Sequence, residues 1–444
     1  MLPSYLAKAV PNPAGNRAPW YTNIAPSYAG IFLWIAFYQS MAVGTINRAS
    51  LGVCLAAIAV AGLLSFALYY YVPAMLGMKT GFPLYVVGSS TFGTKGGYIM
   101  PGLFMGVLQV GWFAVGTFFA TKFILSGFGS DAQPGSLPFI LVGIVWGYSI
   151  AYVGVKGIGY VSRVAIFLNA IPFFMILIVF FKTQPGIAQH VPSDPNPFVA
   201  FTLLIQIVIG FFATAGAAGA DFGMSARGAK DVRLGGFVGI ALAVLFTAGL
   251  PVLSVAGAKV LFPQMQGLNY DAVISGIGGI LATAMFFLFT IASIPASCIC
   301  AFITGNSFAT MLPGVPRMTS TMIGVTISIV LAVTGLAQNL ISFFTIIGAS
   351  FGPICGAMAA DYLLAGKRWA GPREGINLAG YIAWALGFAV GILPFFPVSE
   401  QVKTLAQPAV VYSFITGFVV YAILAKAGLE PRSVATPNAP ISPE

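Results

Sequence analysis

Long apolar runs with almost no charge between them constrain this 444-residue chain more than any other feature of its sequence. Stretches of about 20 apolar residues recur along nearly its whole length, and each can cross a hydrocarbon layer of about 30 Å as a helix. Only 7% of the residues are charged, whereas soluble globular proteins carry about 25%. Because so few charges cannot cover the surface of a soluble fold, the sequence predicts an all-α polytopic membrane protein.

Glycines, prolines and charge clusters divide the chain into about twelve predicted spans. The spans are expected at 26–46, 51–76, 99–125, 137–155, 160–181, 200–222, 234–258, 272–311, 318–337, 339–365, 377–396 and 408–426. The eighth is too long for one crossing, so we expect it to continue into a kinked or surface segment. A polar segment, 1–25, precedes the spans, and the tail 427–444 is expected to be disordered.

The basic residues predict the orientation of the spans. With the N-terminus in the cytoplasm, fifteen Lys and Arg residues fall in inside segments and five in outside segments, as the positive-inside rule requires. The net charge of +10 therefore reports topology, and it does not indicate nucleic-acid binding. We expect a multi-pass protein of the cell membrane with both termini cytoplasmic and no removable signal peptide.

A glycine-rich stretch, "GFFATAGAAGADFG", covers residues 210–223 at the end of the sixth span. Glycine costs about 1 kcal/mol relative to alanine inside a helix, so this stretch favours a local break. Broken backbone is tolerated at membrane depth only where it lines a cavity or binds something. The alternative is a tight helix crossing without a break.

Weaker signs of a similar break occur in the outer half of the first span, in "FYQSMAVGTIN", which contains Gln39. If spans one to five and six to ten are inverted repeats, spans one and six are equivalent. Both are then discontinuous, with a substrate site between them near the midplane. This symmetry rests on the positions of the spans alone.

The third span contains an amide and an indole, Gln109 and Trp112, three residues apart on one helical face. An amide in hydrocarbon needs partners, because each unsatisfied group costs several kcal/mol. The pair suits a flat heteroaromatic ring with amide edges. Bonding between helices is the alternative role for Gln109.

Ser293 and Ser297 share a face of the eighth span, with Pro295 between them. Proline frees one helical carbonyl, and hydroxyl and carbonyl oxygens are hard ligands that suit a small cation such as sodium. Alternatively, the serines bond back to their own helix and bend it.

Two carboxylates are interpreted as gating or structural residues. Asp221 lies near Arg227 and Lys230 in the sequence, and Asp361 lies near Lys367 and Arg368. Ion pairs of this kind suit a closed inner gate, and solvated span ends are the alternative.

Three stretches together resemble one known family, the nucleobase–cation symporters, which include cytosine, purine, allantoin and hydantoin permeases. They are "LGMKTGFPLYVVGSSTFGTKGGYIMPGLFMGVLQVGWFAVG", "ATAGAAGADFGMSARGAKD" and "GASFGPICGAMAADYLLAGKRW". The resemblance covers roughly residues 26–426. It implies a five-plus-five inverted repeat of 26–181 and 200–365, two added helices in 377–426, and alternating access.

The resemblance also implies the roles of the site residues. Trp112 and Phe212 match the two aromatic residues that stack on the substrate ring. Gln109, Thr214 and Gln39 match polar neighbours of the substrate. No cofactor is expected beyond a coupling ion.

The sequence departs from the family pattern in the eighth span, where "ASIPASCICAFITGN" lacks the adjacent hydroxyl pair that holds sodium in sodium-coupled members. Sodium and protons both stay open as coupling ions, with Ser293 and Ser297 as sodium ligands or Asp221 as the proton carrier.

We therefore expect a symporter, acting as a monomer, that imports a nucleobase or a related heterocyclic amide. Alternatives are an amino-acid or organic-cation transporter of the same fold, in which Trp112 would hold a cation by cation–π attraction, or a channel. A membrane-embedded enzyme is disfavoured by the single histidine and by the lack of an intramembrane carboxylate cluster.

Overall fold

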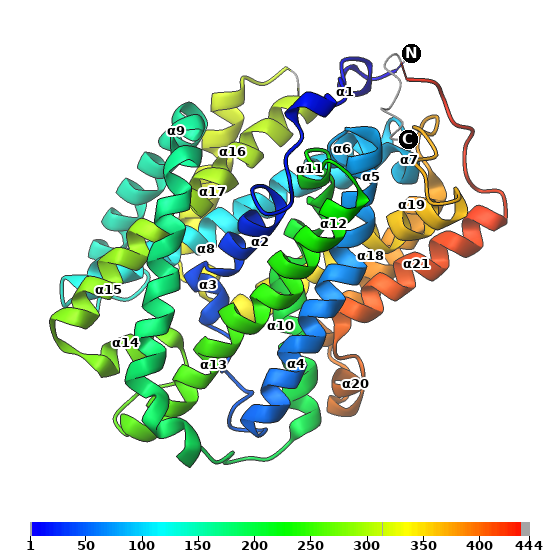
Figure 1. The fold of residues 1–444 in the computed structure, drawn as a ribbon. Coiled ribbons are helices and arrows are strands. Elements are labelled where there is room, and N and C mark those ends of the chain that lie inside the picture. Colours follow the sequence, from blue (N-terminus) through cyan, green and yellow to red (C-terminus); the bar gives the residue numbers. More distant parts are fainter. Residues whose placement is uncertain (1, 313, 437–444) are drawn as a thin grey trace.

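The computed structural model describes residues 2–312 and 314–436, and for residues 157–166 it describes the backbone alone. The described part is a bundle of helices without a strand (Figure 1). Within it, nine helices are long and apolar enough to cross a membrane, and two shorter apolar helices, Arg317–Val333 and Leu378–Gly391, accompany them. With the broken first span described below, these segments confirm the predicted all-α membrane fold.

The first half of the chain forms spans one to five. Its elements are α1 (Ser4–Ala7), η1 (Ala14–Asn16), α2 (Ile24–Phe32), α3 (Ile35–Tyr38), α4 (Leu51–Leu64), η2 (Ser65–Tyr70), α5 (Tyr71–Thr80), α6 (Leu84–Val87), α7 (Ser89–Phe92), η3 (Gly96–Tyr98), η4 (Ile99–Leu103), α8 (Phe104–Gly127), α9 (Leu137–Thr183) and η5 (Gln184–Gln189). The expected fourth and fifth spans both lie in α9. Residues 137–156 and 167–189 are separate candidate spans, and the second continues from α9 through η5.

The second half forms spans six to ten and two further helices. Its elements are α10 (Pro197–Ala217), α11 (Gly219–Gly223), α12 (Ala229–Gly236), η6 (Phe237–Leu242), α13 (Ala243–Leu261), α14 (Tyr270–Ile277), α15 (Gly279–Ala292), α16 (Ile294–Met311), α17 (Arg317–Val333), η7 (Leu336–Gln338), α18 (Leu340–Leu364), α19 (Leu378–Gly391), η8 (Leu393–Phe395), α20 (Glu400–Leu405) and α21 (Ala409–Lys426). Asparagine side chains cap the N-termini of α10, α18 and α19, as expected for a residue that accepts from free backbone N–H groups.

Spans one, six and eight are discontinuous. The first breaks between α2 and α3, where Trp34 has an extended backbone with ψ of 128°. The sixth is interrupted at Ala218, inside the predicted glycine-rich stretch, but α10 runs unbroken for 21 residues before it. The break therefore lies inside the predicted stretch, toward the end of the span. The eighth breaks at Gly278 and again at Ser293, which confirms that it is longer than one crossing.

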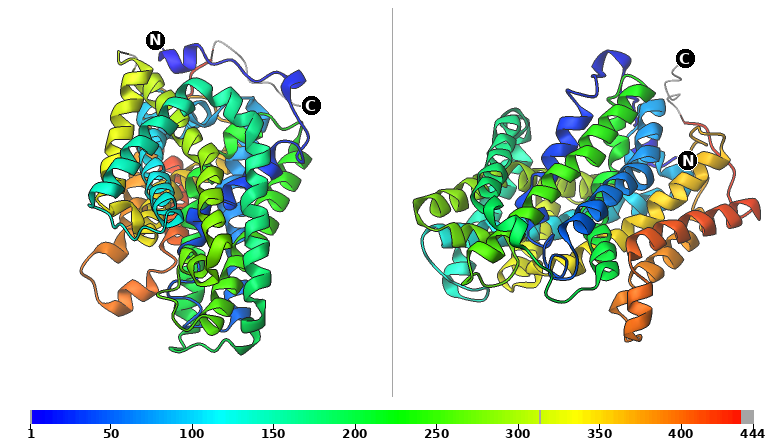
Figure 2. Two further views of the ribbon diagram at one scale, coloured as in Figure 1. Left: turned by 90° about the vertical axis from the view of Figure 1, so that its left-hand side faces the viewer. Right: turned by 60° about the horizontal axis from the view of Figure 1, so that its bottom comes forward.

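The helices pack in two groups, with the last helices against one side (Figures 1 and 2). The first group contains α2, α4, α10 and α13, and the second contains α8, α16, α17 and the first part of α9. The helices α19 and α21 pack on α18, which in turn packs on α10. Gly210 allows that last contact, because a Cβ at this position would lie 2.5 Å from the Phe344 carbonyl oxygen.

The N-terminal segment and the described part of the tail lie at the same end of the bundle. The Tyr5 hydroxyl donates to the Thr94 carbonyl, and Ser433 and Val434 bond to the loop that follows α18. The expectation of a disordered tail is wrong for residues 428–434, because backbone bonds and ion pairs hold them against that loop. Residues 437–444 of the predicted tail lie outside the described residues.

Candidate functional site

Trp112 lies where a helix of one group meets a helix of the other. Its indole Nε1–H donates a hydrogen bond to the Thr214 hydroxyl over 3.2 Å, and both side chains are 4% exposed. Trp112 belongs to α8 and Thr214 to α10, so this bond joins the third span to the sixth. The structure thus brings together two residues that the sequence predicts to bind substrate.

Aromatic rings surround Trp112. The ring centroids of Trp34, Phe211 and Phe343 each lie 5.1 Å from that of Trp112, and the Phe344 centroid lies at 5.7 Å. Trp34 comes from the break in the first span and the last two from α18. Aromatic pairs at these distances contribute about 0.5–1.5 kcal/mol each beyond their burial. They hold the indole in one orientation between the helix groups.

Phe212 faces away from this cluster. Its ring stacks on Phe32 at 5.4 Å and also meets Tyr28 at 5.5 Å. Successive residues on a helix point about 100° apart, so Phe211 meets Trp112 while Phe212 packs against α2. The expected sandwich of Trp112 and Phe212 is therefore not formed by the described residues, and Phe211 is the sixth-span ring beside Trp112.

Gln109 lies on the same face of α8 as Trp112, one turn earlier. Its Nε2 is 3.7 Å from the Met105 sulfur, and the side chain is 8% exposed. A thioether is a weak acceptor, so the amide keeps most of its capacity to bond a ligand.

Gln39 lies farther from the indole than expected. It is 4% exposed, and its Nε2 has no hydrogen-bond partner in the described part of the chain. Gln39 lines a cavity of about 170 Å³ together with Ser40 and Phe119. Phe119 follows Trp112 by seven residues, or about 10 Å along α8, so Gln39 lines an approach to the indole.

A larger cavity of about 510 Å³ adjoins the first and shares Phe118, Lys122 and Gln338 with it. The Lys122 Nζ forms an ion pair with Asp271 Oδ2 at 2.5 Å, which ties α8 to the short helix α14. Figure 1 shows α14 at the end of the bundle opposite α6 and α7. The two cavities therefore form a polar route from that end toward the aromatic cluster.

The two serines of the eighth span differ in their bonding. The Ser293 hydroxyl donates to the Thr290 carbonyl over 2.7 Å, which is the back-bonding alternative. The Ser297 hydroxyl is fully buried and has no hydrogen-bond partner among the residues described. It packs closely against Gly116, where a Cβ would lie 2.6 Å from the Ser297 Oγ.

Asp221 does not pair with Arg227 as expected. Arg227 instead pairs with Asp231 at 2.9 Å, one helical turn away. The Asp221 carboxylate accepts the Leu84 N–H over 3.4 Å at the start of α6. Burial raises the pKa of Asp221 to about 6. Its predicted gating role stays a prediction, without the expected ion pair.

Asp361 also has different partners from those expected. It is 3% exposed and pairs with Arg373 at 2.8 Å, not with Lys367 or Arg368. Its other oxygen accepts from the Ser90 and Thr91 hydroxyls over 2.6 and 3.0 Å. The carboxylate faces α7, and Lys367 and Arg368 lie in the exposed loop beyond it.

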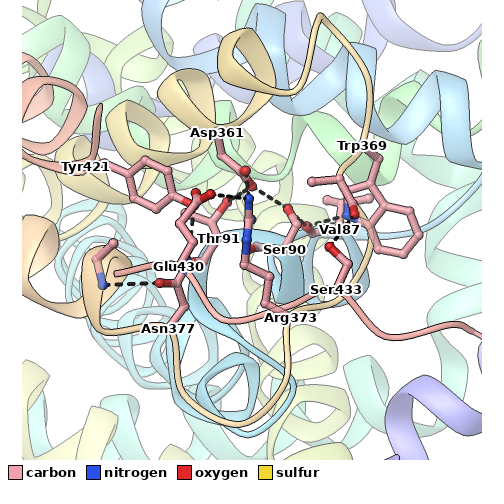
Figure 3. A network of polar contacts seen from close by, with 12 residues as sticks. Val87, Ser90, Thr91, Asp361, Trp369, Arg373, Asn377, Tyr421, Glu430 and Ser433 are labelled. Atoms are coloured by element: carbon pink, nitrogen blue, oxygen red, sulfur yellow. Dashed lines mark hydrogen bonds and ion pairs between the residues drawn. The ribbon is translucent and has the colours of Figure 1, made fainter. Parts of the chain in front are cut away.

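Arg373 extends this network to the tail (Figure 3). Its second terminal nitrogen pairs with Glu430 at 2.9 Å, and Glu430 accepts from the Tyr421 hydroxyl over 2.7 Å. Asn377 donates to Tyr421 and to the Thr91 carbonyl. The network thereby fastens α21 and the tail to α7, at the end of the bundle opposite α14.

Sequence reasoning missed Trp34, Phe211, Phe343, Phe344 and Arg373. The first span contains a tryptophan near its middle, and the tenth contains two adjacent phenylalanines. Because their neighbours in the sequence are also apolar, nothing in the pattern distinguishes these aromatic residues from ordinary lipid-facing or core residues. Arg373 stands among other basic residues, and nothing in the sequence singles it out as the partner of Asp361.

Comparisons with known proteins agree with this arrangement. Residues 11–417 match the family model described as "Permease for cytosine/purines, uracil, thiamine, allantoin". The cytosine permease of Escherichia coli strain K12 is 26% identical over 344 residues, which cover 74% of this chain and 76% of that protein.

Two solved structures of Mhp1, a nucleobase-cation-symport-1 family transporter, share the fold. The closed conformation with bromovinylhydantoin bound gives a TM-score of 0.69 at 16% identity, covering 94% of this chain and 95% of Mhp1. The inward-facing conformation gives 0.71 at 14% identity, covering 96% of each chain.

Proposed function

This chain belongs to the family of permeases for cytosine and purines, uracil, thiamine and allantoin, and we propose that it imports one nucleobase or related heterocyclic amide together with a cation. It is a multi-pass membrane transporter. The observation that carries the proposal is the position of Trp112, held by Thr214 at the contact between the two helix groups.

In this proposal, the substrate ring stacks on the Trp112 indole. Stacking of a base on an aromatic side chain contributes about 1–3 kcal/mol, and Phe211 lies beside the indole to form a second wall. Gln109 and Thr214 bond the polar edge of the ring. Gln39 lines the route by which the substrate arrives, and Phe212 supports the site from behind through Phe32 and Tyr28.

Transport proceeds by alternating access of the two helix groups. The polar cavities beside Lys122 open the route from the end that carries α14. The positive-inside rule makes this the outer end, since Lys79, Lys367 and Arg368 lie at the opposite end. Substrate drives closure to the extent that it binds the closed state more tightly.

For the coupling ion, the chain offers two candidates. Sodium would use hydroxyl oxygens of the eighth span, where Ser293 and Ser297 lie. A proton would use Asp221, whose raised pKa makes it titrate near neutrality.

The test is binding of cytosine, uracil, hypoxanthine, allantoin and hydantoin to the purified protein by thermal shift, with and without sodium. A ligand at 100 times its Kd stabilises by about 2.7 kcal/mol. We expect at least one heterocycle to raise the melting temperature of the wild type and not that of the Trp112→Ala variant. If no heterocycle raises the wild-type value, the proposed substrate class is wrong.

A further inference from the structure

The short helix α14 lies between the two helix groups at the end of the bundle where the polar cavities open (Figure 1). Along the chain it connects α13, which packs on α2 and α4, with α15, which packs on α8. Its first two residues, Tyr270 and Asp271, contact different parts of the bundle. A helix that holds both groups must release one of them whenever the groups separate at this end.

Tyr270 fastens α14 to the first span. Its side chain is fully buried, and its ring centroid lies 5.3 Å from that of Tyr38 in α3. On its other side the ring meets Phe289 of α15 at 6.3 Å. The residue that follows Tyr38, Gln39, lines the smaller cavity. The contact with Tyr38 therefore holds α14 beside the route toward Trp112.

Asp271 fastens α14 to the third span through its ion pair with Lys122. The Asp271 side chain is 13% exposed and that of Lys122 is 36% exposed. The second carboxylate oxygen, Asp271 Oδ1, is buried and has no hydrogen-bond partner in the described part of the chain. Because a buried charge is costly without its partner, this carboxylate depends on Lys122. We therefore expect the pair to hold α14 more firmly than a fully exposed ion pair would.

The ion pair lies where the route narrows. Lys122 and Asp271 both line the larger cavity of about 510 Å³, and Lys122 also lines the smaller cavity of about 170 Å³. Gln39 and Ser40 lie beyond the pair, on the wall of the smaller cavity, and each is 4% exposed. The space beyond the pair is therefore nearly closed to solvent.

We propose that the Lys122–Asp271 ion pair is a latch on the outer route. While the pair is intact, α14 joins the two helix groups and restricts passage from the larger cavity to the smaller one. When the pair breaks, α14 can move away from α8 and the substrate can pass. The inference rests on the proposed function, which makes this end the outer one and supplies the substrate that uses the route.

The first test needs no substrate. Ser40→Cys places a thiol in the smaller cavity, and its rate of labelling by a bulky polar maleimide measures how often the route opens. The four native cysteines are buried, and the wild type gives their background. Labelling of Ser40→Cys is compared before and after the addition of Lys122→Gln, Asp271→Asn or both. Asp271→Asn removes the buried charge itself, so it supplies a folded variant even if Lys122→Gln does not fold.

Lys403→Gln is the matched control. The Lys403 side chain is 34% exposed, close to the value for Lys122, and it also forms an ion pair, with Glu400. That pair lies within α20, whose residues line neither cavity. Loss of a lysine charge at a comparable exposure is thus separated from release of α14.

We expect each single replacement in the latch to speed labelling by about tenfold. The double variant should gain no more than either single variant, because both replacements break the same pair. Lys403→Gln should leave the rate unchanged. Equal rates in all backgrounds would overturn the inference. Additive effects of Lys122→Gln and Asp271→Asn would also overturn it, since the two residues would then not act through their pair.

The second test distinguishes a latch from a residue that contacts the bound substrate. A latch that forms with or without substrate changes the rates of entry and exit alike. Stopped-flow binding of the heterocycle that binds best should therefore show association and dissociation both about tenfold faster in Asp271→Asn, with a Kd within about twofold of the wild type. A tenfold weaker Kd at an unchanged association rate would overturn the latch.

The two tests also separate the inference from the proposed function. If no heterocycle of the panel binds the wild type, the proposed function fails, whereas the labelling rates still decide whether the Lys122–Asp271 pair controls access to the smaller cavity. If a heterocycle binds the wild type and the labelling rates are the same in all backgrounds, the proposed function stands and the latch is wrong.

Discussion

The Trp112 indole N–H and the Thr214 hydroxyl, 102 residues apart in the sequence, are joined by a 3.2 Å hydrogen bond between the third and sixth spans. The two spans belong to different helix groups, so the bond crosses the contact that alternating access must rearrange. It also fixes the plane of the ring on which we propose that the substrate stacks. This hydrogen bond therefore connects the packing of the two helix groups with the proposed binding of substrate.

Replacing Thr214 by valine should weaken substrate binding by about five- to tenfold, because the buried indole N–H of Trp112 loses its acceptor. The Trp112 ring is then no longer held in the orientation on which the substrate stacks. Thr214→Ser should retain wild-type affinity. The measurement is calorimetric titration of the heterocycle that binds best. Thr202→Val is the matched control, since that hydroxyl bonds within α10 to Phe198 and Val199. Equal affinities for Thr214→Val and the wild type would show that the bond does not orient the ring.

Replacing Arg373 by alanine should destabilise the protein strongly, by about 3–5 kcal/mol, because the change leaves the buried Asp361 carboxylate without its cation. Arg432→Ala is the control. Arg432 pairs with Glu374 at the same end of the bundle, but its side chain is 82% exposed, so solvent screens the pair and its loss should change stability far less. Thermal unfolding in detergent compares the two variants. Similar melting temperatures would contradict a structural role for the network in Figure 3.

The Asp221→Asn variant should change the pH dependence of stability. Burial raises the pKa of Asp221 from 3.8 to about 6, so the folded protein holds this proton more tightly than the unfolded chain does. The resulting stability is fully present below about pH 4 and is lost as the pH rises through about 6. Its upper limit is about 3 kcal/mol.

Melting temperatures between pH 4 and 7 test this prediction. The wild type should lose stability with rising pH relative to Asp221→Asn, and the exposed control Asp194→Asn should follow the wild type. Parallel curves for the wild type and Asp221→Asn would show that Asp221 does not titrate in this range. If Asp221 also carries the coupling proton, Asp221→Asn should abolish the pH dependence of uptake.

The all-helical membrane fold could be predicted from sequence because hydrocarbon thickness sets the length of each span, and charge limits where it ends. The approximate position of the sixth-span break could also be predicted from its glycines. Its depth could not, because α10 continues to Ala217 through packing against α4 and α18, which overrides the weak helix propensity of glycine.

The site could be predicted only in part. Trp112 and Thr214 stand out as polar groups in apolar helices. The choice between Phe211 and Phe212 depends on the rotation of α10 against its neighbours, and two adjacent phenylalanines give no hydrophobic pattern that fixes it. The partner of Asp361 could not be predicted because tertiary packing brings Arg373 to it from twelve residues along the chain. Tertiary packing likewise brings Glu430 to the same guanidinium from 57 residues beyond Arg373.

The most direct test of the account is uptake of a radiolabelled heterocycle into proteoliposomes under an imposed sodium or proton gradient, comparing the wild type with Trp112→Ala. We predict gradient-dependent, saturable uptake by the wild type and loss of uptake by the variant, with both proteins inserted to the same extent. Uptake by Trp112→Ala at the wild-type rate and KM would contradict a substrate site on Trp112. No gradient-driven uptake of any heterocycle by the wild type would contradict the proposed transport function itself.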